Sequence, residues 1–161
     1  MNDERKSGSV ERVRQALEAR GAGAKIVCFD QSTRTAAEAA AAVGCEVGQI
    51  AKSLIFKSRR TERPILVIVR GNARVNEQKV ADTLGEKIRR ADAKFVREKT
   101  GFAIGGVAPV GHTGDVVTFI DGGLGAFDKI WAAAGTPNTV FETTLDELVL
   151  MTGVDPIEIC E

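Results

Sequence analysis

Four glycines and one proline interrupt an apolar stretch at residues 100–112, which read Thr-Gly-Phe-Ala-Ile-Gly-Gly-Val-Ala-Pro-Val-Gly-His. Glycine tolerates positive φ and close approach of other groups, whereas proline restricts its own φ and the residue before it. The pattern therefore predicts a rigid, shaped loop with accessible main-chain amides. An ordinary turn between two elements would use similar residues, so this alternative stays open.

Length and composition predict one domain over residues 1–161. Hydrophobic residues make up 43% and charged residues 27% of the chain, and no apolar run approaches the ~20 residues that a membrane span needs. Residues 1–9 mix charges and lack the apolar core of a secretory signal. We therefore expect a cytoplasmic protein with no membrane partner.

Cysteine and histidine usage predicts neither a disulfide framework nor a metal site. Cys28, Cys45 and Cys160 are widely spaced without a Cys-x-x-Cys pair, and His112 is the only histidine. Free cysteines usually behave as small buried hydrophobes. No metal and no cofactor are expected.

The net charge of zero hides a strong asymmetry along the chain. Residues 52–99 hold fourteen Lys/Arg against six Asp/Glu, whereas residues 100–161 hold one base, Lys129, against nine acids. A basic middle of this kind indicates a face that binds a polyanion. Solvated charges that pair with each other would give the same counts.

Apolar spacing and capping residues predict five helices and a set of short strands. The helices begin after Ser9, Thr35, Asn76, Asp92 and Thr144, and end at Gly21, Gly44, Gly85, Gly101 and Gly153. The strands cover residues 25–29, 51–57, 64–70, 116–120, 129–133 and 139–143, with a further edge strand at 157–159. Two hairpins are expected, 51–57 with 64–70 and 129–133 with 139–143. Without a regular βαβ rhythm, the order favours an α+β fold with a mixed, largely antiparallel sheet.

Lys52 occupies an unusual position in its predicted strand. It shares one face with Leu54 and Phe56, and a lysine on an apolar face is costly unless it meets a partner or a cavity. A phosphate, a carboxylate or a bound carbonyl at the mouth of a pocket would suit it. The alternative is that the side chain extends to solvent at the strand end.

The chain lacks Gly-x-Ser-x-Gly, a P-loop and a metal-ligand cluster. His112 lies in a glycine-flanked turn and is expected to be solvated. Asp121 could bind a substrate amine or cap the following Gly122-Gly123 turn. The amides of Gly105 to Pro109 are the best candidates for an oxyanion or carbonyl site, because aligned backbone donors need no side chain.

Three segments together resemble the YbaK/ProX group of aminoacyl-tRNA deacylases. They are Gln49-Ile50-Ala51-Lys52-Ser53-Leu54-Ile55-Phe56, Arg70-Gly71-Asn72-Ala73-Arg74-Val75-Asn76 with Lys79, and Thr100-Gly101-Phe102 through Gly105-Gly106-Val107-Ala108-Pro109-Val110-Gly111. The resemblance runs from the Thr35 helix to the final helix. It implies an editing-domain fold, a sheet or partial barrel with surrounding helices. Such proteins are freestanding relatives of the editing domain of bacterial prolyl-tRNA synthetase, and they hydrolyse mischarged aminoacyl-tRNA.

The resemblance also implies roles for individual residues. Lys52 and Gly105 would be catalytic, with Lys52 contacting the acceptor-end phosphate or placing the ester. The loop from Gly105 to Pro109 would hold the aminoacyl carbonyl, and water or a substrate group would attack. The implied substrate-binding residues are Ser53, Gly101, Phe102, Gly106, Val107, Ala108, Pro109 and Asp121. The implied partners are a mischarged tRNA and an aminoacyl-tRNA synthetase, with no DNA.

Two functions from different classes fit these residues. The first is a metal-independent hydrolase that removes a small amino acid from tRNA-Pro or a similar tRNA. Phe102, Ile104 and Val107 would form an apolar wall that rejects large side chains, and Ser53 and Ala108 would tune the pocket. The second is a binding or regulatory module that holds an aminoacyl-tRNA end, an amino acid or a nucleotide without turnover.

Overall fold

The helices begin and end at the capping residues that the sequence supplies. Four side chains each accept a hydrogen bond from the amide three positions ahead: Thr35, Asn76, Asp92 and Thr144. A glycine in the left-handed region ends each of the same helices: Gly44, Gly85, Gly101 and Gly153. The first helix differs from its prediction, because it begins at Glu4 rather than after Ser9. Glu, Arg and Lys are good helix formers, and they extend it upstream.

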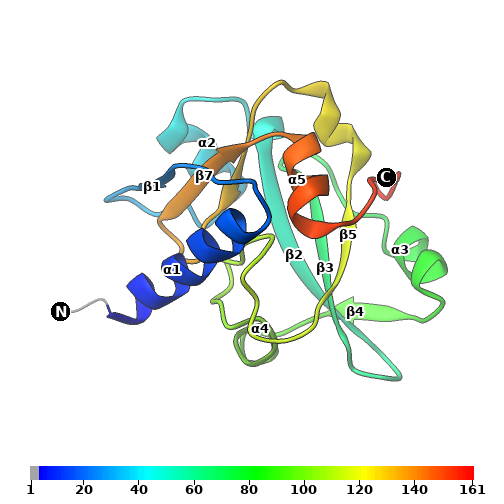
Figure 1. Ribbon diagram of the computed structural model, residues 1–161. Coiled ribbons are helices and arrows are strands. Elements are labelled where there is room, and N and C mark those ends of the chain that lie inside the picture. The colour runs from blue at the N-terminus through cyan, green and yellow to red at the C-terminus, as the bar shows by residue number, and fades with distance from the viewer. Residues whose placement is uncertain (1–3) are drawn as a thin grey trace.

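A computed structural model describes residues 4–161 (Figure 1). Residues 1–3, which the prediction about the chain start included, lie outside the described residues. The helices are α1 (Glu4–Ala19), α2 (Ala36–Val43), α3 (Glu77–Leu84), α4 (Ala93–Thr100), α5 (Leu145–Thr152) and the 3-10 turns η1 (Val47–Gln49) and η2 (Gly122–Ala126). The strands are β1 (Ile26–Cys28), β2 (Ile50–Ser58), β3 (Pro64–Arg70), β4 (Ile88–Arg90), β5 (Val117–Ile120), β6 (Ile130–Ala133) and β7 (Thr139–Thr143).

All seven strands join one mixed sheet in the order β1-β7-β6-β2-β3-β5, with β4 pairing β2 as well. Four strand pairs are antiparallel, and two, β2 with β6 and β3 with β5, are parallel. Both predicted hairpins form, and the predicted α+β class with a largely antiparallel sheet is confirmed. Residues 157–159 do not form a regular strand; Ile157 instead makes an isolated bridge to Asp121.

One edge of β2 is covered only at its two ends. Ile50 and Ala51 pair with β6, and Phe56 to Ser58 pair with β4. No strand pairs with this edge at residues 52–55 within the described chain. The carbonyl of Ile55 accepts from the amide of Ala91 (3.2 Å). Main-chain groups at alternate positions of a strand point to the same edge. The amide and carbonyl of Ser53 therefore also face this uncovered part of the β2 edge.

Two apolar clusters cover the two faces of the central sheet. Leu66 and Ile68 of β3 pack with α1, α4 and α5, whereas their neighbours Val67 and Val69 pack with Phe56 and α3. The alternation follows from the opposite directions of successive side chains in a strand. A third, smaller cluster joins α2 to the start of β2. This arrangement sets α2 beside the uncovered edge.

None of the helices within residues 4–161 has the length and apolar character that crossing a membrane requires.

Candidate functional site

A cavity of about 190 Å³ opens beside the uncovered edge of β2. Its wall consists of the segment entering α2, the first half of β2, the glycine-rich loop, and strands β6 and β7. The lining residues are Thr33, Arg34, Thr35, Ala36, Ala39, Ile50, Ala51, Lys52, Ser53, Leu54, Ile104, Gly105, Val107, Trp131, Ala132, Ala133 and Val140. Two of them, Arg34 and Lys52, are cationic and none carries a carboxylate. The lining therefore favours a ligand that presents oxygen acceptors or negative charge.

Four of the predicted site residues meet in this cavity: Lys52, Ser53, Gly105 and Val107. Two of them come from β2 and two from the loop, more than fifty positions along the chain. The structure therefore brings Lys52 and the glycine-rich loop together in the lining of one cavity.

Lys52 is half-buried at the mouth of the cavity. Its Nζ donates to the carbonyl of Gly71 (3.3 Å), and no carboxylate within residues 8–161 lies at ion-pair distance from it. Burial lowers the pKa of Lys52, and the charges of Arg90 and Arg74 act in the same direction. The ammonium thus keeps unused donors and has no carboxylate in direct contact, which is an arrangement suited to an anionic ligand.

The glycine-rich loop lies too close to its neighbours for side chains at two positions. Gly105 has a φ of 89°, and a Cβ there would lie 2.3 Å from Cγ of Arg34. At Gly106 a Cβ would lie 2.7 Å from the main-chain carbon of Thr136. Only glycine fits such contacts without displacement of the backbone. The loop is therefore held against both the segment entering α2 and the β6–β7 turn.

Several residues of this loop line the cavity with main-chain amides that make no hydrogen bond within the described residues, Ile104 among them. The Gly106 amide donates to the Ala103 carbonyl (2.9 Å) and closes a turn. No hydrogen bond from the amides of Gly105 or Val107 occurs in the described part of the chain, and both residues line the cavity. Free amides at a cavity wall are donors for a carbonyl or an oxyanion.

Among residues 8–161, Ser53 carries the one buried side-chain polar atom that has no hydrogen-bond partner. The residue lines the main cavity and a side pocket of about 60 Å³. Ile55, Val96 and Val107 line the side pocket together with Gly105 and the cationic Arg90. Buried hydroxyls are nearly always paired. The Oγ of Ser53 therefore has its donor and its acceptor capacity unused by the described residues.

Five other predicted binding residues are absent from the cavity lining: Gly101, Phe102, Gly106, Ala108 and Pro109. The Phe102 ring is only 1% exposed and belongs to the larger apolar cluster. His112, expected in solvent, packs edge-on against this ring and bonds the carbonyl of Ala108 through Nε2 (2.8 Å). Burial lowers the pKa of His112. Phe102 and His112 therefore pack within the protein rather than in the cavity lining.

Asp121 also lies outside the cavity lining. Its carboxylate accepts from the Gly123 amide (2.8 Å) and from Nε of Arg70 (2.8 Å). Burial acts to raise the pKa of Asp121, but these hydrogen bonds outweigh it and hold the pKa below its usual value. Asp121 therefore caps the turn that follows β5 and fixes the end of β3.

Sequence reasoning missed three residues that shape the site. Arg12 of α1 donates to the carbonyls of Gly101 (2.8 Å) and Gly111 (3.2 Å), and so ties together the two ends of the loop. Arg34 and Trp131 line the cavity. Trp131 is the only tryptophan of the chain, a signal that could have drawn attention to it; Arg12 and Arg34 carry no comparable signal.

No group of three or more His, Cys, Asp or Glu side chains within residues 8–161 is placed to hold a metal ion. The lining of the cavity itself offers hydroxyls, amides and two cations. Metal ions in proteins are bound by carboxylates, imidazoles and thiolates, and the lining offers none of these.

Comparisons with known proteins match this chain to one family. The family model described as the aminoacyl-tRNA editing domain matches residues 30–150. The protein YwhH of Bacillus subtilis strain 168 is 35% identical over 120 residues, which cover 74% of this chain and 76% of YwhH. The proline–tRNA ligase of Limosilactobacillus fermentum is 36% identical over 91 residues, which cover 54% of this chain but only 16% of the ligase.

The fold has a close counterpart among solved structures. A crystal structure described as "a putative trans-editing enzyme for prolyl tRNA synthetase" superposes with a TM-score of 0.87 at 45% identity, covering 95% of this chain and 97% of the other.

Proposed function

The chain belongs to the aminoacyl-tRNA editing domain family, and from this premise we propose that it hydrolyses the ester of a mischarged tRNA that carries a small amino acid. One observation carries the proposal. Lys52 and the free amides of Gly105 and Val107 line a single cavity of about 190 Å³. A cation and main-chain donors in the lining of one small cavity suit an ester whose alcohol is part of a nucleotide.

The chemistry follows from how these groups would meet the ester. The amides of Gly105 and Val107 donate to the carbonyl oxygen and stabilise the negative charge that develops on it. Lys52 binds an oxygen of the terminal nucleotide and orients the ester. Water attacks the carbonyl carbon, the ester C–O bond breaks, and the terminal ribose oxygen leaves with a proton. The products are a free amino acid and an uncharged tRNA.

No side chain that could serve as a nucleophile is placed with an obvious base in the cavity. Thr33, Thr35 and Ser53 line it, but the lining holds no histidine or carboxylate to activate them. Attack by a water molecule fits this composition, as does attack by a hydroxyl or thiol of the substrate itself that releases the tRNA and leaves a cyclic product for water to open. Positioning and electrostatics would supply the rate enhancement.

The volume and the wall restrict the amino acid. Ile50, Ile104, Val107 and Trp131 present apolar surface, and the side pocket beside Ser53 measures about 60 Å³. A pocket of this size holds a side chain of only a few heavy atoms. Because solved and curated relatives carry prolyl-tRNA synthetase in their names, tRNA-Pro charged with alanine, serine, threonine or cysteine is the first set of substrates to assay.

The test is a deacylation panel with two lysine variants. Wild type should release at least one small amino acid from tRNA faster than spontaneous hydrolysis, with EDTA present. Lys52→Ala should lower kcat by tenfold or more. Lys57→Ala is the matched control, because Lys57 lies on the same strand but points to the opposite face, near Glu62 (3.7 Å). Its kcat should match wild type.

The panel also separates hydrolysis from binding alone. A binding module would bind the aminoacylated end and slow its spontaneous hydrolysis. Protection of every ester by wild type would refute the proposed hydrolase. Equal kcat values for Lys52→Ala and wild type would refute the role of Lys52.

A further inference from the structure

A basic groove leads away from the cavity along β2. The groove has a volume of about 740 Å³ and shares Lys52 and Leu54 with the cavity. Arg74 and Arg90 add two exposed cations, while Glu77 and Glu161 lie in the same wall. The guanidinium of Arg90 lies over the Phe56 ring, 5.5 Å from the ring centroid. Cations therefore continue from the cavity to β4.

The far end of β2 forms a second basic hollow. Its volume is about 370 Å³, and its wall holds Arg59, Arg60 and Lys87 together with Gly85 and Glu86. The Arg59 amide donates to the Lys87 carbonyl (2.8 Å), which extends the β2–β4 ladder by one residue. The hollow therefore adjoins the β2–β4 strand pair, whose residues Phe56 and Arg90 line the end of the groove.

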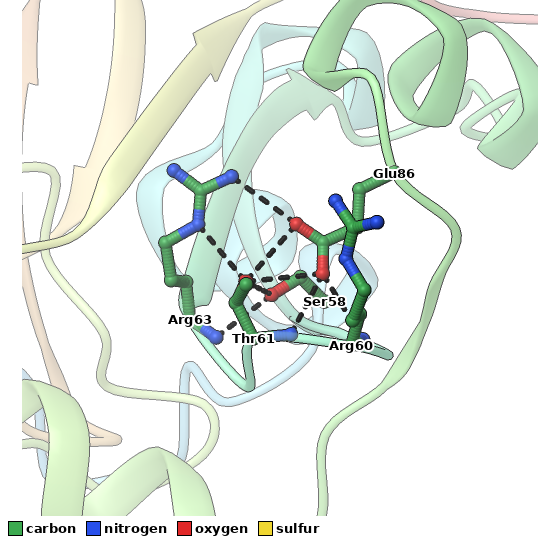
Figure 2. Close-up of polar contacts among 5 residues, drawn as sticks. All are labelled: Ser58, Arg60, Thr61, Arg63 and Glu86. Carbon is green, nitrogen blue, oxygen red and sulfur yellow. Dashed lines mark hydrogen bonds and ion pairs between the residues drawn. The ribbon is translucent and has the colours of Figure 1, made fainter.

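The one carboxylate of this hollow is already used by the protein (Figure 2). Glu86 accepts from the amides of Arg60 (3.0 Å) and Thr61 (2.8 Å), from the Thr61 hydroxyl (3.0 Å), and from Nη2 of Arg63 (3.3 Å). Hydrogen bonds from Thr61 are the main cause that lowers the pKa of Glu86 to about 2. The carboxylate fixes the β2–β3 turn to the loop before β4, and its charge is offset by Arg63.

The remaining cations of the hollow have no such partner. Arg59, Arg60 and Lys87 are exposed, and none of them takes part in an ion pair within the described residues. Glu86 holds together the two main-chain segments that carry these residues, so the spacing of their Cα atoms is fixed. Three uncompensated cations on a fixed backbone form a site for successive phosphates.

We propose that this end of the sheet, Arg59, Arg60 and Lys87, binds phosphates of the acceptor stem of the tRNA whose aminoacylated end occupies the cavity. The inference rests on the proposed function. Arg59 directly follows β2 and lies seven positions after Lys52, a distance of about 23 Å at the rise of an extended chain. The single-stranded 3′ end would lie along the groove, and the base-paired stem would begin beyond it.

The surface chemistry favours RNA over a membrane or a protein partner. Exposed large hydrophobic side chains within the described residues are Val47, Ile104 and Leu150, none of which belongs to this end of the sheet. Membrane-surface helices and the cores of protein interfaces need apolar or aromatic anchors. Phosphate binding needs only cations and main-chain donors.

The test compares two triple variants on two substrates. Arg59→Gln, Arg60→Gln and Lys87→Gln are combined in one protein. The matched control combines Arg14→Gln, Arg20→Gln and Lys25→Gln, exposed cations of α1 and of the segment before β1. Each is assayed with the preferred full-length aminoacyl-tRNA and with the same amino acid on a CCA trinucleotide. Binding of uncharged tRNA is measured between 50 and 300 mM salt.

The expected loss is confined to the full-length tRNA. The first triple variant should lower kcat/KM on tRNA by about tenfold or more, and leave the trinucleotide within twofold of wild type. Its slope of log affinity against log salt should fall by about two to three, one for each lost phosphate contact. The control triple variant should behave as wild type.

Two results would overturn the proposal. One is equal losses on tRNA and trinucleotide, and the other is uncharged-tRNA affinity that the first triple variant leaves unchanged. If wild type hydrolyses neither substrate, the proposed function fails, whereas the binding measurement still decides whether these cations bind tRNA.

Discussion

Replacing Ser53 with alanine should separate stability from activity, because its hydroxyl has no partner in the protein. Ser53 Oγ is buried and forms no hydrogen bond with any of residues 8–161. A second serine on the same strand provides the matched control. Ser58 is fully buried, and its Oγ contacts Oγ1 of Thr61 (2.8 Å) and accepts from the Arg63 amide (2.8 Å).

The two substitutions should change the free energy of unfolding in different directions. An unsatisfied buried polar group costs about 1–3 kcal/mol. Ser53→Ala removes that group without breaking a bond, so the free energy of unfolding should stay the same or rise by up to about 1 kcal/mol. Ser58→Ala leaves the Arg63 amide without its acceptor and should lower the free energy of unfolding by about 1–3 kcal/mol.

Activity should follow the opposite order. If Ser53 Oγ bonds a ligand group, Ser53→Ala should lower kcat/KM on the preferred substrate by about fivefold or more, which corresponds to one lost hydrogen bond of about 1 kcal/mol. Ser58→Ala, distant from the cavity lining, should retain wild-type kcat/KM at temperatures where it is folded. Urea unfolding and the deacylation panel measure both quantities on the same preparations.

A destabilisation of more than about 1 kcal/mol by Ser53→Ala would refute this reasoning, since it would show that the hydroxyl is bonded within the folded protein. Unchanged activity of Ser53→Ala on every small aminoacyl ester would show that no substrate group uses Oγ. A Ser53→Ala protein that is stable and less active supports both parts.

Two further predictions concern the loop and the β2–β3 turn. Gly105→Ala should lower the free energy of unfolding by about 1–2 kcal/mol, because this position has a positive φ. It should also reduce the deacylation rate tenfold or more, because the new Cβ would press against Arg34. Gly153→Ala is the control: with φ 71° and open space around its Cβ, it should show a similar stability loss with full activity. A Gly105→Ala protein as active as wild type would refute the requirement for a glycine in the cavity wall. Because the pKa of Glu86 falls from 4.5 to about 2 on folding, its stabilising contribution is complete above pH 4.5 and is lost as the pH falls toward 2. Glu86→Gln should therefore flatten the acid limb of a stability–pH curve between these values, and an acid limb identical to wild type would contradict this assignment.

Local chemistry explains the elements that sequence reasoning predicted well. The strands 64–70 and 139–143 have the predicted bounds, and four helices begin at their predicted caps. A cap or an apolar run acts within a few residues, so it can be read without knowledge of the fold. Strand β4 was missed because its three residues, Ile-Arg-Arg, have no strand pattern of their own. It exists because β2 offers an edge for pairing.

The sequence by itself determined the parts of the site but not their arrangement. It identified a lysine on an apolar strand face and a loop that only glycine and proline could shape. The tertiary structure decided that Lys52 and Gly105 line one cavity, and that Phe102 and Asp121 lie outside it. The physical reason is that β2 is covered by β6 at one end and by β4 at the other. The cavity between these two ends depends on contacts between segments far apart in the sequence, so no local sequence pattern predicts it.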